Sequence, residues 1–279
     1  MERWEVSPRY PGPVATVAEV WKYRNLLRFI GDRALRRIYR RTILGWLWLI
    51  INPLFPIVLR VLIFGVLLGV GSEGLPYFLF LLGGTIVWEV FAASLMRGTR
   101  ALEQNRDLAE QVYHPRALLP LGSISPALLD FVIKVAVFLV AVAYYVARDG
   151  QLYIRVDQGL LWAAAALVVA LVCAIGISMF TSIWGENTRD AQFALSQLVA
   201  VWYLLTPVLY PLSQVPEPYR GWMLLNPLAI VVETFKWGLF GVGTLEPRLF
   251  GMTALAVLVL FLTGLVYFAR AEARTIDKR

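Results

Sequence analysis

The sequence predicts an all-α integral membrane protein with six transmembrane helices. Two observations support this class: six long apolar stretches, and positive charge gathered on one side of them. The stretches are residues 43–70, 76–96, 121–147, 160–184, 191–210 and 249–269. Each holds about 20 residues or more, and a helix needs roughly 20 residues to cross a ~30 Å hydrocarbon core.

The distribution of Lys and Arg orients these spans. With the N-terminus inside, the cytoplasmic segments hold ten such residues in 1–42, four in 97–120, one in 185–190 and four in 270–279. The outer loops hold five, and the spans hold Arg60 and Lys134. Cytoplasmic loops of membrane proteins carry the excess of Lys and Arg. Both termini are therefore expected in the cytoplasm.

The composition excludes an ordinary soluble domain. Hydrophobic residues make up 59% and charged residues 16% of the chain, against about 45–50% and 25% in soluble proteins. We attribute the net charge of +7 to contact with anionic membrane lipid, and we expect no nucleic-acid partner. The single cysteine, Cys173, lies inside a span and allows neither an intrachain disulfide nor a cysteine zinc site.

The cytoplasmic N-terminal segment, residues 1–42, contains an amphipathic pattern. From Val20 to Ile30 apolar residues recur at helical spacing among Lys and Arg, as in a helix lying in the lipid headgroup layer. Gly31-Asp32 is expected to break this helix, and a second basic helix, residues 33–41, should follow. The segment is either a membrane anchor or an element docked against a partner subunit.

Entry into the first span carries a candidate gate. Pro53 and Pro56 each remove a backbone donor inside an apolar run, so a kink is expected there, although kinks are common in membrane helices. The gate and entry candidates are Arg40, Arg41, Trp48, Asn52 and Pro53.

The second cytoplasmic segment, residues 97–120, is predicted to include a short helix. Leu108, Val112 and Tyr113 form an apolar stripe, and Pro115 should end the helix at His114. An ordinary loop would not need this stripe. A short helix of mixed charge held parallel to the membrane is suited to pushing against another protein.

The outer segment, residues 211–248, is the longest. Asn226-Pro227 opens an apolar run interrupted by Glu233 and Lys236. We expect two short helices that dip into the outer leaflet and return, which membranes tolerate where protein or a water-lined cavity covers the helix ends. A seventh span is the alternative, and it would place the tail, residues 270–279, outside.

Four ionisable residues lie within the spans: Arg60, Glu89, Asp130 and Lys134. Asp130 and Lys134 are four residues apart, so an intrahelical pair is the simplest arrangement. Glu89 lies at a similar depth and is a second candidate partner for Lys134. We favour structural pairing over a proton relay or an ion site. Among the aromatic residues, the candidates for lining a channel are Trp48, Trp88, Phe91 and Tyr203, with lipid-facing packing as the alternative for each.

Three stretches resemble one known family. Residues 39–53 (YRRTILGWLWLIINP), 105–120 (NRDLAEQVYHPRALLP) and 210–216 (YPLSQVP), the last followed by Asn226-Pro227 and Glu233, resemble permease subunits of type-2 ABC exporters for bacterial cell-surface polysaccharide. The likeness extends over about residues 18–270. It identifies the second stretch as a coupling helix that contacts the ATPase, with the residues Asn105, Asp107, Leu108, Glu110, Val112, Tyr113 and Arg116.

The resemblance implies a homodimer in the bacterial inner membrane, bound to two ABC ATPase subunits. It also implies a lipid-linked glycan cargo such as O-antigen, capsule or teichoic acid. The chain has no G-x-x-x-x-G-K-[ST] loop to hold ATP phosphates. ATP and Mg²⁺ are therefore expected on the partner, and this chain should hold no cofactor or metal and have no enzyme activity. An ABC exporter of a drug or lipid is the alternative. A membrane enzyme would need a cluster of catalytic carboxylates or a metal motif, and neither appears.

Overall fold

The computed structural model describes residues 24–39, 47–105 and 118–276, and the regular structure in these ranges is entirely helical. The elements are α2 (Arg24–Tyr39), α3 (Trp48–Arg60), the π-helix η2 (Val61–Leu67), α4 (Tyr77–Thr99), α5 (Ala101–Gln104), α7 (Leu118–Ser123), α8 (Ser125–Asp149), α9 (Gly159–Asn187), α10 (Arg189–Leu204), the 3-10 helix η3 (Leu212–Gln214), α11 (Glu217–Met223), α12 (Pro227–Phe240) and α13 (Pro247–Ile276). For these residues the all-α prediction is confirmed.

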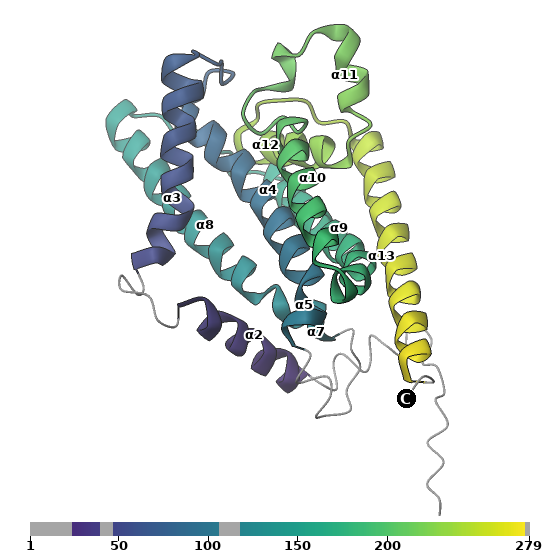
Figure 1. The fold of residues 1–279 in the computed structure, drawn as a ribbon. Helices are drawn as coiled ribbons and strands as arrows, with labels where there is room; N and C mark the ends of the chain where they lie inside the picture. Colours follow the sequence, from purple (N-terminus) through teal and green to yellow (C-terminus); the bar gives the residue numbers. More distant parts are fainter. Residues whose placement is uncertain (1–23, 40–46, 106–117, 277–279) are drawn as a thin grey trace, which may run out of the picture.

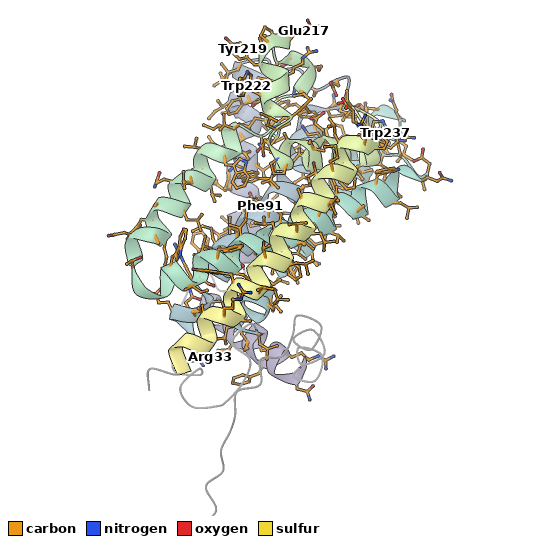
Figure 2. All side chains as sticks on the ribbon, turned by 90° about the vertical axis from the view of Figure 1, so that its right-hand side faces the viewer. Arg33, Phe91, Glu217, Tyr219, Trp222 and Trp237 are labelled. Carbon is orange, nitrogen blue, oxygen red and sulfur yellow. The ribbon has the colours of Figure 1, made fainter. Side chains whose placement is uncertain are left out.

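The helices form one bundle with two distinct ends (Figure 1). α2 and the last turns of α13 lie at the lower end of the view, and α11 and α12 lie at the upper end. α3, α4, α8 and α13 run between the two ends. Seen from the side, Arg33 lies near the lower end while Glu217, Tyr219 and Trp222 lie at the upper end (Figure 2). This arrangement fits the orientation expected from the charge distribution, with α2 and α11 on opposite sides.

Four of the expected spans are present at full length. Within the described ranges, the helices long and apolar enough to cross a membrane are Tyr77–Thr99, Leu118–Asp149, Gly159–Gly185 and Pro247–Ala271. α11 and α12 meet the same criteria only as a pair, and they are bent by 102° at the break between them. The chain is therefore a multi-pass membrane protein. The bend suits either a broken span or the expected pair that enters and returns.

The first and fifth expected spans are helical but shorter. The apolar helix Ile51–Leu67 falls below spanning length, and residues 43–46, where the span was expected to begin, lie outside the described ranges. α10 has 16 residues and ends at Leu204 rather than near Tyr210. The cause is Pro207, which has no N–H with which to continue the helical hydrogen bonds. The count of six spans stays a prediction.

α2 corrects one expectation. It is a single helix from Arg24 to Tyr39, so Gly31-Asp32 does not break it. Gly31 lies where α2 crosses the start of α8, and a Cβ there would collide with the Ser125 hydroxyl. On the facing side, a Cβ on Gly122 would lie 2.7 Å from the Ile30 side chain. The glycine serves close helix packing, which membrane proteins use widely.

α4 and α9 form the centre of the bundle. In α4, 78% of the most apolar stretch of 18 residues is buried, and α4 packs against α8, α9 and α12. The start of α9 packs closely against Gly238 of α12, and the end of α9 packs closely against Thr99 of α4. Glycines bring α9 against α13 as well, because a Cβ on Gly264 would lie 2.8 Å from the Gly176 carbonyl. α4 is thus the common support for α8, α9 and α12, and two of these helices carry the candidate residues Asp130, Lys134 and Glu233.

Candidate transport and coupling sites

Asn226 connects the start of α12 to the end of α10 through hydrogen bonds. Its Oδ1 accepts hydrogen bonds from the Leu228 backbone N–H at 3.0 Å and from Trp202 Nε1 at 2.8 Å. Its Nδ2 donates to the Thr206 hydroxyl at 3.0 Å and to a backbone carbonyl at 3.2 Å. Pro227 takes the first helical position, where its missing donor costs nothing. The Asn-Pro pair therefore marks a helix start, and its second function, holding α10, was not visible in the sequence.

Beneath this junction lies a buried ion pair on α12. Lys236 is 0% and Glu233 3% exposed, and Lys236 Nζ lies 3.9 Å from Glu233 Oε1. The ammonium also donates a 2.5 Å hydrogen bond to the Pro207 carbonyl and lies 3.8 Å from the Phe80 ring centre. Lys236 thus links α12 to α4 and to the chain that follows α10. From the sequence, Glu233 was expected to be a site residue and Lys236 was noted only as a charge in the same apolar run. A lysine three residues after a glutamate in an apolar helix is nevertheless a pattern that indicates a buried pair.

The loop between α8 and α9 holds α12 from the other side. The Arg155 guanidinium lies 4.6 Å from the Trp237 ring centre, and the Arg155 backbone N–H donates to the Leu239 carbonyl at 2.8 Å. The same guanidinium donates to Asp157 at 2.5 Å and lowers the pKa of that carboxyl. α12 is therefore fixed at both ends rather than free to swing.

The intramembrane charges pair across helices. Lys134 Nζ of α8 lies 2.7 Å from Glu89 Oε2 of α4, and Arg60 Nη1 of α3 lies 3.8 Å from Glu89 Oε1. Asp130 pairs with Arg97 of α4 at 3.4 Å. The intrahelical pair expected between Asp130 and Lys134 is not among the ion pairs of the described residues. Because α4 packs directly on α8, each of these side chains finds a closer partner on the neighbouring helix.

Four aromatic rings form one cluster between α4 and α10. Trp88 lies 5.5 Å from Phe91, 6.4 Å from Trp202 and 5.4 Å from Tyr203, measured between ring centres. Trp88 is 5% and Phe91 0% exposed, and Figure 2 shows Phe91 inside the bundle. In this structure these two residues therefore pack the core and do not line a channel, contrary to expectation. Trp48 and Tyr203 are half-buried, and their contact with a channel stays a prediction.

Most coupling and entry candidates lie outside the described residues: Arg40, Arg41, Asp107, Leu108, Glu110, Val112, Tyr113 and Arg116. Asn105 is described and is 4% exposed. Its Nδ2 donates to the Ala101 carbonyl at 2.8 Å and to the Ser123 hydroxyl at 3.3 Å. It therefore connects the chain on either side of residues 106–117, and its side chain is buried rather than exposed as expected for a residue that contacts the ATPase.

The entry candidates Asn52 and Pro53 of α3 differ in their exposure to solvent. Asn52 is exposed and Pro53 is buried. α3 continues through Pro53 and Pro56 as one helix and changes to the π pattern of η2 after Arg60. A change of helix type thus follows Arg60, and the kink expected at Pro53 and Pro56 stays a prediction. Among the described residues, no group of three His, Cys, Asp or Glu is arranged to hold a metal ion.

The chain is similar to proteins named as export and transport proteins. Over 268 residues the chain is 29% identical to the O-antigen export system permease protein RfbA of Myxococcus xanthus, covering 93% of this chain and 97% of the relative. A protein of the same description from Klebsiella pneumoniae is 25% identical over 90% of this chain and 93% of its own. The polysialic acid transport protein KpsM of Escherichia coli is 27% identical over 86% of this chain and 92% of its own.

A family model covers the greater part of the chain, from the first helix described by the structure to the end of α12. The matched residues are 25–240 of 279, and the model is that of the ABC-2 type transporter. The chain therefore belongs to the ABC-2 type transporter family.

Proposed function

We propose that this chain forms the transmembrane channel of an ATP-driven exporter that moves a lipid-linked polysaccharide from the cytoplasmic to the outer face of the bacterial inner membrane. The observation that carries the proposal is the likeness to an O-antigen export permease over 93% of this chain and 97% of that relative. The chain is a transport permease and not an enzyme, and ATP hydrolysis is the task of a separate ATPase subunit.

The proposed assembly is a homodimer of this chain above two ATPase subunits. Coupling to the ATPase is supported by the ends of the coupling segment, residues 106–117, because α5 follows α4 after one residue and α7 precedes α8 by one residue. The Asn105–Ser123 hydrogen bond joins α5 to α7. A push on residues 106–117 would therefore be passed to α4 and α8 together, and these helices carry the Glu89–Lys134 pair.

Deleting the chain tests the function. We expect surface polysaccharide to disappear and lipid-linked glycan to accumulate inside, measured by glycan immunoblot and lipid extraction. Changing the phosphate-binding lysine of the partner ATPase should give the same phenotype, which separates loss of transport from loss of synthesis. Normal surface glycan together with altered sensitivity to apolar drugs would instead favour the drug or lipid exporter.

The orientation predicts a labelling pattern. In a Cys173→Ser background, which removes the one native thiol, a cysteine at Gln214 should react with an impermeant maleimide in intact cells. A cysteine at Arg274 should react only after permeabilisation, because an even number of spans places the tail inside. Labelling at 274 in intact cells would establish α11 and α12 as a seventh span and remove the re-entrant pair.

A further inference from the structure

The paired charges of the bundle form one row with a surplus of positive charge. Arg97 pairs with Asp130, Lys134 follows one turn later on α8 and pairs with Glu89, and Glu89 also faces Arg60. The row holds three cations and two carboxylates. No further carboxylate in the described part of the chain pairs with any of them. One cation therefore has no carboxylate of its own.

That cation is Arg60. Lys134 holds Glu89 at 2.7 Å, whereas Arg60 Nη1 is 3.8 Å from the same carboxylate, beyond hydrogen-bond length. No described group accepts a hydrogen bond from Nη1, although protein encloses this atom. The guanidinium lies against the Tyr203 ring, 4.8 Å from its centre. The aromatic face orients the guanidinium. Because Nη1 is enclosed, the exposed 29% of the Arg60 side chain belongs to its other atoms.

The depth of Arg60 limits what its accessible part can face. It lies 12 residues after Trp48 on a helix, which places it ~18 Å from the inner end, and a hydrocarbon core is ~30 Å thick. The side chains of Arg60 and Glu89 are each 29% exposed, against 5% for Lys134. Charges at such depth face a protein interior or a water-filled cavity, because facing lipid chains is costly. The exposed side of Arg60 therefore faces a pathway or a second copy.

We propose that Arg60 is an anion-contact site in the transport pathway, where it receives acidic substituents of the moving chain, such as uronic carboxylates or phosphodiesters. The inference rests on the proposed export function and adds a substrate class to it. A guanidinium matches the two oxygens of a carboxylate or phosphate. Glu89 competes for the same guanidinium, so each acidic group is held weakly and released. Weak contact suits a polymer that has to slide past.

The test uses the full permease–ATPase complex in lipid nanodiscs and measures binding by calorimetry. The probes are trigalacturonate and its neutral counterpart galactotriose. Wild type should bind trigalacturonate at least about tenfold more tightly, and Arg60→Gln should remove this difference. Glu89→Gln should strengthen trigalacturonate binding, because the competing carboxylate becomes a neutral amide. Arg148→Gln, which removes a 61% exposed guanidinium at the end of α8, is the matched control and should bind both probes as wild type does.

A merely structural ion pair predicts a different pattern. In that case Arg60→Gln and Glu89→Gln would weaken the complex alike, and wild type would bind both probes equally. Either result overturns the proposal. If the complex carrying Arg60→Gln does not assemble, as judged by gel filtration, the variant Arg60→Lys is used to test the proposal. Lysine keeps the positive charge but lacks the paired N–H donors of the guanidinium. Unchanged trigalacturonate binding in Arg60→Lys would therefore contradict an arginine contact.

This result is independent of the deletion test. A deletion that abolishes surface glycan, together with equal binding of the two probes, would overturn the anion contact and leave the export function standing. A deletion that leaves surface glycan intact would overturn the export function itself.

Discussion

Lys236→Met should strongly destabilise the folded protein. The substitution removes the cation from the buried pair and leaves Glu233, 3% exposed, without its Lys236 partner. It also leaves the Pro207 carbonyl without the 2.5 Å hydrogen bond from Nζ. Removing one member of a buried pair costs about 3–5 kcal/mol. We expect a large fall in the temperature at which the detergent-solubilised protein loses its gel-filtration peak.

The double variant Lys236→Met/Glu233→Gln separates charge from shape. It removes both charges, so it should recover a clear part of the loss, because replacing both members of a buried pair is far less costly than removing one. Arg248→Met, which changes an exposed residue at the start of α13, is the control and should leave the transition unchanged. If the temperature at which Lys236→Met loses its gel-filtration peak equals that of wild type, the buried ammonium does not hold α12 in place.

The general architecture was predictable because it depends on quantities carried by single segments. Apolar length and the side on which Lys and Arg gather are properties of each stretch alone. They gave the helical class and four full-length spans. The start of α12 was predictable for the same reason, since Asn226 caps a helix whose first residue is Pro227. The early end of α10 was also readable, because Pro207 lacks the donor that a longer helix would need.

The site details depend on which helices touch, and no single segment carries that information. Spacing along α8 favoured Asp130 as the partner of Lys134, whereas packing against α4 supplies Glu89 instead. Gly31 is a residue type that often breaks helices. Only the close approach of α2 to Ser125 of α8 shows why a glycine is needed there. Trp88 has the character of a channel residue in isolation. It is buried because α10 brings Trp202 and Tyr203 against it.

Leu108→Asp and Val112→Asp should abolish export while the permease still inserts into the membrane. Both residues belong to the coupling segment outside the described ranges, so this prediction rests on their sequence pattern and on the family resemblance. The apolar stripe they share with Tyr113 is proposed to lie in a groove of the ATPase. Burying an unpaired carboxylate there costs several kcal/mol, and each 1.4 kcal/mol weakens binding tenfold.

The measurements are co-purification of the ATPase with tagged permease and the amount of surface glycan. Gln111→Asp introduces the same charge between the two positions but outside the stripe, and it should retain both the ATPase and most of the export. Because α5 and α7 join this segment to α4 and α8, a variant that keeps the ATPase bound but loses export would mark failure of transmission rather than of docking. Normal co-purification and normal surface glycan in both stripe variants would place the ATPase contact elsewhere on the cytoplasmic side.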